Sequence, residues 1–335
     1  MSGLAGHVER RSVTTPARCR ICANTELRPA FRLTQFVVFT CPACGYGTTV
    51  YTSPIDDNQA RFQGERWTET RSLLESVTAA MARRRYADLA PFGPGPDLLE
   101  IGCGTGEFLS CAQALGHRVT GLDLSHRVVA HVASRYPGMD IRCGTLESTH
   151  LAPASFDVIA AFHVLEHVTD PVGLLRQMVS LVRPSGLVYV RVPNLNTWYR
   201  HALGSSWWGF SLDHVGHFTA ASLRRAMTDA GLTVLTARSA DSDPEYSLWP
   251  VLPLLYGHGF VLRSLGSALQ PAAPDAPPGA GRLSDARRIS LKRQLLATYQ
   301  AYRRAATMMI TPLSRLQLAR GGGRELLMIG RKAAS

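Results

Sequence analysis

Residues 97–106 read DLLEIGCGTG, and the rest of the chain is organised around them. An apolar run passes into a loop that has glycine at every second position, at Gly102, Gly104 and Gly106. This pattern predicts a buried parallel strand that turns tightly into a helix. Glycine lets the backbone approach a ligand, because no side chain stands in the way. The dinucleotide-binding fingerprint G-x-G-x-x-G needs its third glycine at position 107, where Glu107 stands. The glycine spacing of this loop therefore differs from that fingerprint.

The composition predicts a folded chain. Its 335 residues exceed one typical domain, and 45% of them are hydrophobic against 18% charged, which allows a sizeable core and excludes global disorder. No run of 18 apolar residues occurs, so a membrane-spanning helix is not expected. The first residues, MSGLAGHVERRSV, lack the apolar segment of a secretory signal, so we expect a cytoplasmic location.

Two Cys-x-x-Cys pairs predict an N-terminal zinc ribbon. Cys19 and Cys22 are followed, after eighteen residues, by Cys41 and Cys44. Such pairs bring four thiolates to one tetrahedral zinc ion, which is structural because no position stays open for catalysis. Residues 31–40, FRLTQFVVFT, alternate as a hairpin strand of a ribbon would. Disulfides or free thiols are the alternative, and the missing secretory signal argues against disulfides.

Helical and strand-like segments alternate after the glycine loop. Helices are expected at 107–116, 125–138, 170–186 and in the first half of 219–239. Strands are expected at 117–125, at 187–194 and in the second half of 219–239. A short strand and a loop are expected at 139–149, and 155–168 begins as a strand that turns over near His163. This alternation predicts a parallel sheet covered by helices on both faces, whose ligands bind at the carboxyl ends of the strands.

The flanking segments differ from this regular core. Before the regular core we expect a polar linker at 53–64 and a helix at 65–90. After the core we expect a broken apolar stretch at 244–268 and a flexible break at 270–281. A helix at 283–309 and a last strand within 320–332 are expected to follow. Between Gly281 and Ser335 there are twelve Lys/Arg and two Asp/Glu, which accounts for most of the net charge of +11. This basic tail is either a solvated helix face or a contact for a membrane surface or another polyanion.

Asp123 ends the second predicted strand, 17 residues after Gly106. In a nucleoside-binding sheet, an acid at this point accepts hydrogen bonds from the ribose hydroxyls. An incidental role as a helix cap beside Ser125 is the alternative.

Four stretches of the chain resemble the successive motifs of the class I S-adenosylmethionine-dependent methyltransferases. They are LLEIGCGTGEFL, VTGLDLS, FDVIAAFHVLEHVTDP and LVRPSGLVYVRVPN, within residues 95–240. The nearest subgroup is the bacterial small-molecule type that includes the ubiquinone-type O-methyltransferases, to which DHVGHFT (213–219) is also similar. The two Cys-x-x-Cys pairs ahead of the domain resemble the ribbon of the deoxysugar C-methyltransferases, although the large C-terminal domain of those enzymes is absent here or replaced by the basic tail.

The resemblance implies a fold and a domain order. The fold would be α/β, a Rossmann-like, doubly wound and mostly parallel seven-stranded sheet, preceded by a small zinc ribbon and followed by a basic helical tail. The domains would be the ribbon at 15–52, the S-adenosylmethionine-binding domain at 65–240 and a C-terminal extension at 241–335.

The resemblance also implies where S-adenosylmethionine binds. The methionine part would lie on the loop, the ribose on Asp123, the adenine on Leu124 and beside Thr145, and the sulfonium near His163. The full set of implied cofactor residues is Glu100, Gly102, Cys103, Gly104, Gly106, Asp123, Leu124, Thr145, Leu146, Phe162 and His163. Many relatives carry an acid where Thr145 stands, which accepts from the adenine amino group, and Glu147 is the candidate substitute for that acid here.

Methyl transfer from a sulfonium is an in-line displacement, so positioning supplies much of the rate. An acceptor hydroxyl must still lose a proton, and histidine suits that task near neutral pH. The candidates are His163, His167, His214 and His217, of which His163 is best placed at the end of its strand. Packing at a helix start is the alternative role for His167, and loop architecture is the alternative role for His214 and His217.

The segment 195–218 is irregular, aromatic and rich in histidine, as binding loops are. Trp207, Trp208 and Phe210 within it line an apolar acceptor pocket or belong to the core, and the sequence does not separate these roles. We expect methyl transfer to a small molecule, namely a hydroxyl of a sugar, a glycan-lipid precursor or a natural product. The alternatives are an RNA methyltransferase that binds phosphates with its ribbon and basic tail, and a cofactor-binding scaffold without catalysis.

Overall fold

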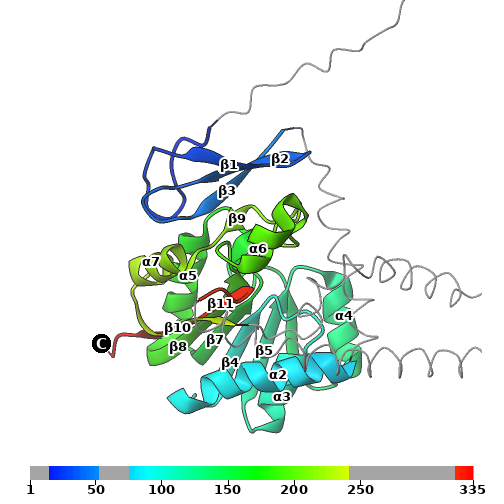
Figure 1. Cartoon of the computed structure of the whole chain (residues 1–335). Helices are drawn as coiled ribbons and strands as arrows, with labels where there is room; N and C mark the ends of the chain where they lie inside the picture. The colour runs from blue at the N-terminus through cyan, green and yellow to red at the C-terminus, as the bar shows by residue number, and fades with distance from the viewer. Residues whose placement is uncertain (1–14, 53–74, 241–320, 335) are drawn as a thin grey trace, which may run out of the picture. The chain divides into compact units, whose positions relative to one another are not determined.

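The computed structural model describes residues 15–52, 75–240 and 321–334, which all fall within one compact unit (Figure 1). The predicted linker at 53–64, the apolar stretch at 244–268, the break at 270–281, the helix at 283–309 and most of the basic tail lie outside these residues. Within the described ranges, no helix is both long enough and apolar enough to cross a membrane.

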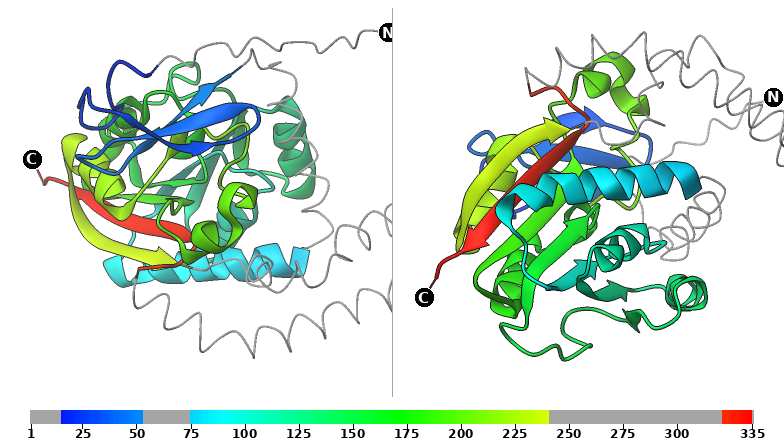
Figure 2. Two further views of the ribbon diagram at one scale, coloured as in Figure 1. Left: turned by 45° about the horizontal axis from the view of Figure 1, so that its top comes forward. Right: turned by 90° about the horizontal axis from the view of Figure 1, so that it is seen from below.

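A seven-stranded, mostly parallel sheet forms the centre of the fold. In spatial order its strands are β10 (Leu232–Ala240), β11 (Glu325–Lys332), β8 (Val182–Pro193), β7 (Phe156–Phe162), β4 (Asp97–Ile101), β5 (Arg118–Asp123) and β6 (Asp140–Cys143). Only β11 pairs antiparallel with its neighbours, between β10 and β8, as the red strand of Figure 2 shows. The predicted sheet and the predicted last strand are therefore confirmed.

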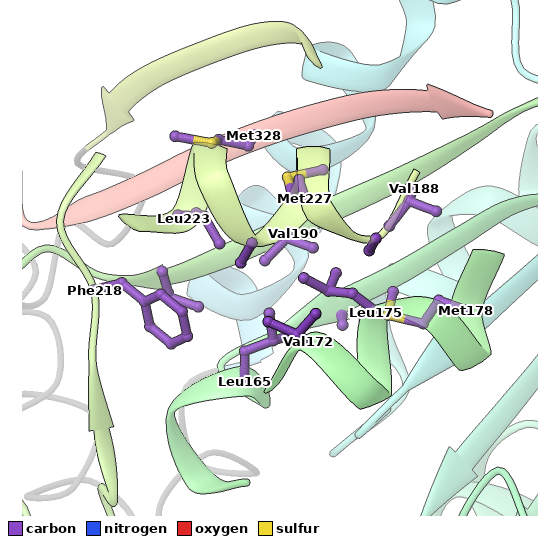
Figure 3. Close-up of a cluster of buried hydrophobic side chains, with 14 of the residues drawn as sticks. Leu165, Val172, Leu175, Met178, Val188, Val190, Phe218, Leu223, Met227 and Met328 are labelled. Carbon is purple, nitrogen blue, oxygen red and sulfur yellow. The ribbon is translucent and has the colours of Figure 1, made fainter. Parts of the chain in front are cut away.

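Helices cover both faces of this sheet. One face carries α2 (Glu75–Leu89), α3 (Glu107–Ala114) and α4 (His126–Arg135), and the other carries α5 (Pro171–Leu181) and α7 (Ala220–Asp229). Leu175 and Met178 of α5 follow helical spacing, as do Leu223 and Met227 of α7. All four side chains are fully buried and lie with Val190 in the cluster of Figure 3.

The helix α5 is shorter than the sequence predicts. It was expected to reach residue 186 but ends at Leu181, and Val182 already pairs with Phe156 in the sheet. Arg183 precedes Pro184, and a residue before proline disfavours the helical conformation. The strand β8 therefore begins five residues before the predicted start.

The ribbon is a small antiparallel sheet of β1 (Arg28–Arg32), β2 (Phe36–Thr40) and β3 (Gly47–Tyr51). The prediction of one strand over 31–40 is wrong, because the chain turns at 33–35 and the Leu33 amide donates to the Phe36 carbonyl at 2.9 Å. The stretch contributes to two strands of the hairpin instead of one.

The ribbon's sheet takes its fourth strand from outside the ribbon, from the segment that precedes α7. This strand is β9 (Gly216–His217), which pairs with β3 through Gly47 and Thr48. Buried ribbon side chains also belong to the same hydrophobic cluster as α5 and α7. The ribbon and the larger sheet are therefore joined by shared backbone pairing and a shared core.

Gly216 marks the tightest point of this junction. A Cβ atom there would lie 2.1 Å from Tyr46 Oη and 3.0 Å from Tyr46 Cζ. We expect Gly216→Ala to lower the free energy of unfolding by about 1–3 kcal/mol, the usual range for overpacking, in urea unfolding. In a Tyr46→Phe background the same substitution should cost clearly less, because the closest atom is gone. Equal costs in the two backgrounds would contradict this account of the junction.

Candidate functional site

The glycine loop connects β4 to α3 in the predicted manner. Gly102, Gly104 and Gly106 all have positive φ, at 68°, 51° and 81°, a region that favours glycine. A Cβ atom at Gly102 would lie 2.7 Å from Val164 Cγ2, and one at Gly106 would lie 2.8 Å from Val132 Cγ1. The backbone conformation and the packing both require glycine, and the loop leads into the amino end of α3, where free amides favour an anionic group.

Asp123 at the end of β5 lies against this loop. Its Oδ2 accepts a hydrogen bond from the Gly104 amide at 3.1 Å, and its Oδ1 accepts one from the Ser125 amide at 3.0 Å. Burial raises the pKa of Asp123, and the backbone donors oppose this shift. The cap of α4 is Ser125, whose hydroxyl accepts from the Val128 amide, so a helix cap does not account for Asp123.

The predicted adenine side contains one exposed apolar residue. Leu124 is 73% exposed, whereas Leu146 is buried, so Leu124 presents apolar surface directly after Asp123. Thr145 is exposed, and its hydroxyl accepts from the Ser148 amide at 3.2 Å. Glu147, the candidate substitute acid, accepts from Gln177 Nε2 of α5 at 2.5 Å.

Three other predicted cofactor residues are buried at the same ends of the strands. Glu100 and Cys103, before and within the loop, are 3% and 5% exposed. Phe162 is 5% exposed, and its ring packs edge-on against Phe108 and Tyr189, with both ring centroids 4.8 Å away. Phe162 is thus a core side chain, and the residue after it, His163, carries the polar chemistry at this point.

His163 lies between two buried carboxylates. Its Nδ1 is 3.2 Å from Glu166 Oε1, and its Nε2 is 3.2 Å from Glu325 Oε1. Carboxylates only accept, so both ring nitrogens donate and the ring is an imidazolium. Burial alone would lower the pKa of His163, but Glu325 and Glu166 outweigh it and raise the pKa to about 9. The histidine that the sequence analysis prefers as base therefore has no lone pair near neutral pH, and this geometry argues against that role.

Glu325 is the residue of this site that sequence reasoning missed. It begins β11, and Arg191 of β8 lies 3.5 Å from its second oxygen. Two side chains hold the preceding backbone: Asn194 Nδ2 donates to the carbonyls of Gly321 and Gly323, and the Thr197 hydroxyl donates to that of Gly322. One feature of the sequence could have indicated Glu325: it is one of only two acids, with Asp285, in the basic stretch between Gly281 and Ser335.

His167 and His214 form a different kind of pair. His167 Nδ1 donates to the Asp213 carbonyl and His214 Nδ1 donates to the Gly209 carbonyl, each at 3.0 Å. Because a carbonyl only accepts, Nδ1 is the donor of each ring, and Nε2 is the nitrogen that carries the lone pair when the ring is neutral. The two ring centroids are 4.8 Å apart. Burial lowers the pKa of His214, which keeps the ring neutral.

His217 belongs to the junction with the ribbon. The Thr49 hydroxyl donates to the His214 carbonyl at 2.8 Å, so His217 Nε2 donates to Thr49 Oγ1, also at 2.8 Å. Burial lowers the pKa of His217 to about 3. The structure thus brings His163, His167 and His214 together, whereas His217 lies on the ribbon side and bonds to Thr49, whose hydroxyl holds the His214 carbonyl.

The two adjacent tryptophans have different surroundings. Trp207 is 2% exposed and packs in one cluster with Phe210 and with Phe36 and Val38 of β2. Trp208 is half-buried, and its ring lies edge-on to His163 at 6.2 Å and to His214 at 6.3 Å. Trp207 and Phe210 are therefore core residues, and Trp208 is the aromatic side chain beside the histidines.

The four ribbon cysteines meet at one point. Their sulfur atoms all lie within 4.8 Å of one another, with Cys19 and Cys44 at 3.6 Å and Cys22 and Cys41 at 3.4 Å. A tetrahedral zinc ion with Zn–S bonds of about 2.3 Å sets its sulfur atoms about 3.8 Å apart. All four thiols are free, so the set fits a structural zinc ion, and these cysteines would hold it.

Part of this chain is similar in sequence to known methyltransferases. Residues 73–237 match the family described as Methyltransferase domain. A Mycolicibacterium smegmatis protein named as an S-adenosylmethionine-dependent methyltransferase is 40% identical over 109 residues, which make up 32% of this chain and 42% of that protein. The ubiquinone biosynthesis O-methyltransferase of Parvibaculum lavamentivorans is 29% identical over 182 residues, or 51% of this chain and 69% of that enzyme.

A solved structure is similar in fold. It is a chain of the complex between the Haloferax volcanii Trm112 methyltransferase activator and a methyltransferase, with a TM-score of 0.51 and 19% identity, and the likeness covers 82% of this chain and 97% of that one. The match to the mycobacterial relative spans only about two fifths of that protein's length.

Proposed function

We propose that this chain transfers the methyl group of S-adenosylmethionine to a small-molecule hydroxyl, because residues 73–237 match the methyltransferase-domain family and a relative named as an S-adenosylmethionine-dependent methyltransferase is 40% identical over 109 residues. The acceptor class is a sugar, a glycan-lipid precursor or a natural product. One observation carries the proposal: the glycine loop, Asp123 and the turn at His163 adjoin at the carboxyl ends of β4, β5 and β7. Ligands of such sheets bind at this edge.

The cofactor would bind across the loop. Asp123 would accept hydrogen bonds from the ribose hydroxyls, the exposed side chain of Leu124 would pack on the adenine, and Thr145 and Leu146 would lie along the adenine edge. The methionine part follows the backbone of the glycine loop, with Glu100 and Cys103 beneath it. S-adenosylmethionine supplies an electrophilic methyl group on a positively charged sulfur.

The acceptor would bind over Trp208. This ring adjoins both His163 and His214, so an acceptor packed on it would lie beside His214, whose ring centroid is 4.8 Å from that of His167. In our proposal the hydroxyl loses its proton beside the cluster of Glu166, His167 and His214. The 29% identity to an enzyme of ubiquinone biosynthesis that is named as an O-methyltransferase supports oxygen as the acceptor atom.

Labelled methyl transfer tests this proposal. The purified chain is incubated with S-adenosylmethionine labelled in its methyl group, once with a small-molecule and lipid extract and once with total RNA. We expect label in the small-molecule or lipid fraction. Label that enters RNA alone would contradict the proposed acceptor class.

A pair of tryptophan variants gives the control. Trp208→Ala should lower the transfer rate at least ~10-fold, because the acceptor loses its aromatic contact, while S-adenosylmethionine still binds. Trp198→Ala removes a half-buried tryptophan that packs on Tyr199, and it should leave the transfer rate close to that of the wild type. Equal transfer rates in the two variants would remove Trp208 from the acceptor site.

A further inference from the structure

Three side chains beside Trp208 could bind a metal ion. Glu166, His167 and His214 each offer one ligand atom, and these atoms all lie within 4.8 Å of one another. Two of the residues lie in the turn after β7, and the third lies in the loop before β9. This group is separate from the ribbon cysteines and contains no sulfur.

Backbone hydrogen bonds fix the orientation of both imidazole rings. Each ring donates Nδ1–H to a backbone carbonyl, His167 to Asp213 and His214 to Gly209. In the neutral form of each ring, Nε2 is therefore the nitrogen that can bind a metal ion. A hydrogen bond from the opposite nitrogen to a carbonyl or carboxylate is what usually orients a metal-binding histidine.

Glu166 supplies the second, independent observation. Its side chain is 1% exposed, and Oε1 is bonded to His163. Among the residues that the structure describes, Oε2 is buried and accepts no hydrogen bond. A buried carboxylate oxygen without a donor is costly, and a cation is the partner that would satisfy it.

We propose that Glu166, His167 and His214 bind a divalent first-row transition metal ion. Two imidazoles and one carboxylate suit ions such as Zn²⁺, Mn²⁺ or Fe²⁺, whereas Mg²⁺ and Ca²⁺ prefer oxygen ligands alone. Three protein ligands leave coordination positions for water or for a substrate oxygen. His167 is the most exposed member, with 35% of its side chain accessible, so the site opens on that side.

The role of this ion rests on the proposed function. An acceptor hydroxyl bound to the ion would have a lowered pKa and release its proton to water. The oxygen lone pair then forms the new bond to the methyl carbon, the carbon–sulfur bond breaks, and its electron pair stays on the sulfur of the leaving S-adenosylhomocysteine. No oxidation or reduction takes place.

Counting bound zinc tests the site without any activity assay. The full chain is dialysed against Zn²⁺, freed of loosely bound metal, and analysed for zinc per chain. We expect a second equivalent in addition to that of the ribbon. His167→Ala should bind the second ion at least ~100-fold more weakly and keep the first, since even outer partners of a metal site contribute ~10–100-fold. His201→Ala removes an exposed histidine of α6 and should keep both ions.

X-ray absorption at the zinc edge identifies the ligands. The wild type should show sulfur together with nitrogen and oxygen neighbours, and His167→Ala should show sulfur alone. Retained ribbon zinc also reports that the variant is folded. A wild type that binds only the ribbon zinc would overturn the proposal, as would a second ion that His167→Ala and His214→Ala both retain. Titration with S-adenosylmethionine tests the proposed function separately.

Discussion

Replacing Asp123 with alanine is expected to weaken the binding of S-adenosylmethionine at least ~100-fold in calorimetric titration, because hydrogen bonds to a charged group contribute about 1.5–3 kcal/mol each and a ribose makes two. The same substitution removes the acceptor that holds the Gly104 amide at 3.1 Å, so the glycine loop also loses a support.

Asp140→Ala is the matched control for this prediction. Asp140 begins the neighbouring strand β6, but it is exposed and pairs with Arg142 at 2.9 Å. Its removal should leave the affinity for S-adenosylmethionine close to that of the wild type. An Asp123→Ala protein that binds the cofactor as tightly as Asp140→Ala would exclude the ribose contact.

Loss of the ribbon metal should have the second large effect. Cys22→Ser is expected to lose the ribbon zinc and to lower the rate of methyl transfer at least ~100-fold, about 2.7 kcal/mol in the barrier. The reason is structural: β3 of the ribbon pairs with β9, and the Thr49 hydroxyl holds the His214 carbonyl at 2.8 Å. Zinc per chain and transfer rate are measured on the same preparation.

Cys143→Ser provides the comparison. Cys143 is also half-buried and free, but it ends β6, away from the four ribbon cysteines. It should keep both its zinc and its transfer rate. If Cys22→Ser lost zinc and still transferred methyl groups at the wild-type rate, the ribbon would not support the reaction site.

Local sequence was sufficient to predict the sheet and the loop. Alternating apolar strands and amphipathic helices predict the parallel core, and the three glycines predict a tight turn that the structure confirms with three positive φ angles. These features depend on residues that are close in the chain, so their periodicity and turn chemistry are readable without the structure.

The polar site could not be predicted in the same way. Glu325 lies 162 residues from His163 in the chain. The sequence around His163 therefore does not predict the contact with Glu325 that favours the imidazolium form of His163. Trp207 and Trp208 are neighbours of one type, yet Trp207 is buried in a cluster with residues of β2, whereas Trp208 is half-buried beside His163 and His214. The pairing of β9 with β3 likewise joins segments with no local signal. Each case depends on contacts between distant segments, which one sequence does not encode locally.

The central claim is that the edge of the sheet around the glycine loop binds S-adenosylmethionine. Calorimetric titration of the full-length chain with this cofactor tests the claim most directly. We predict saturable binding of one molecule per chain, strongly weakened in Asp123→Ala. A wild-type protein that is folded and shows no binding of S-adenosylmethionine would contradict the account.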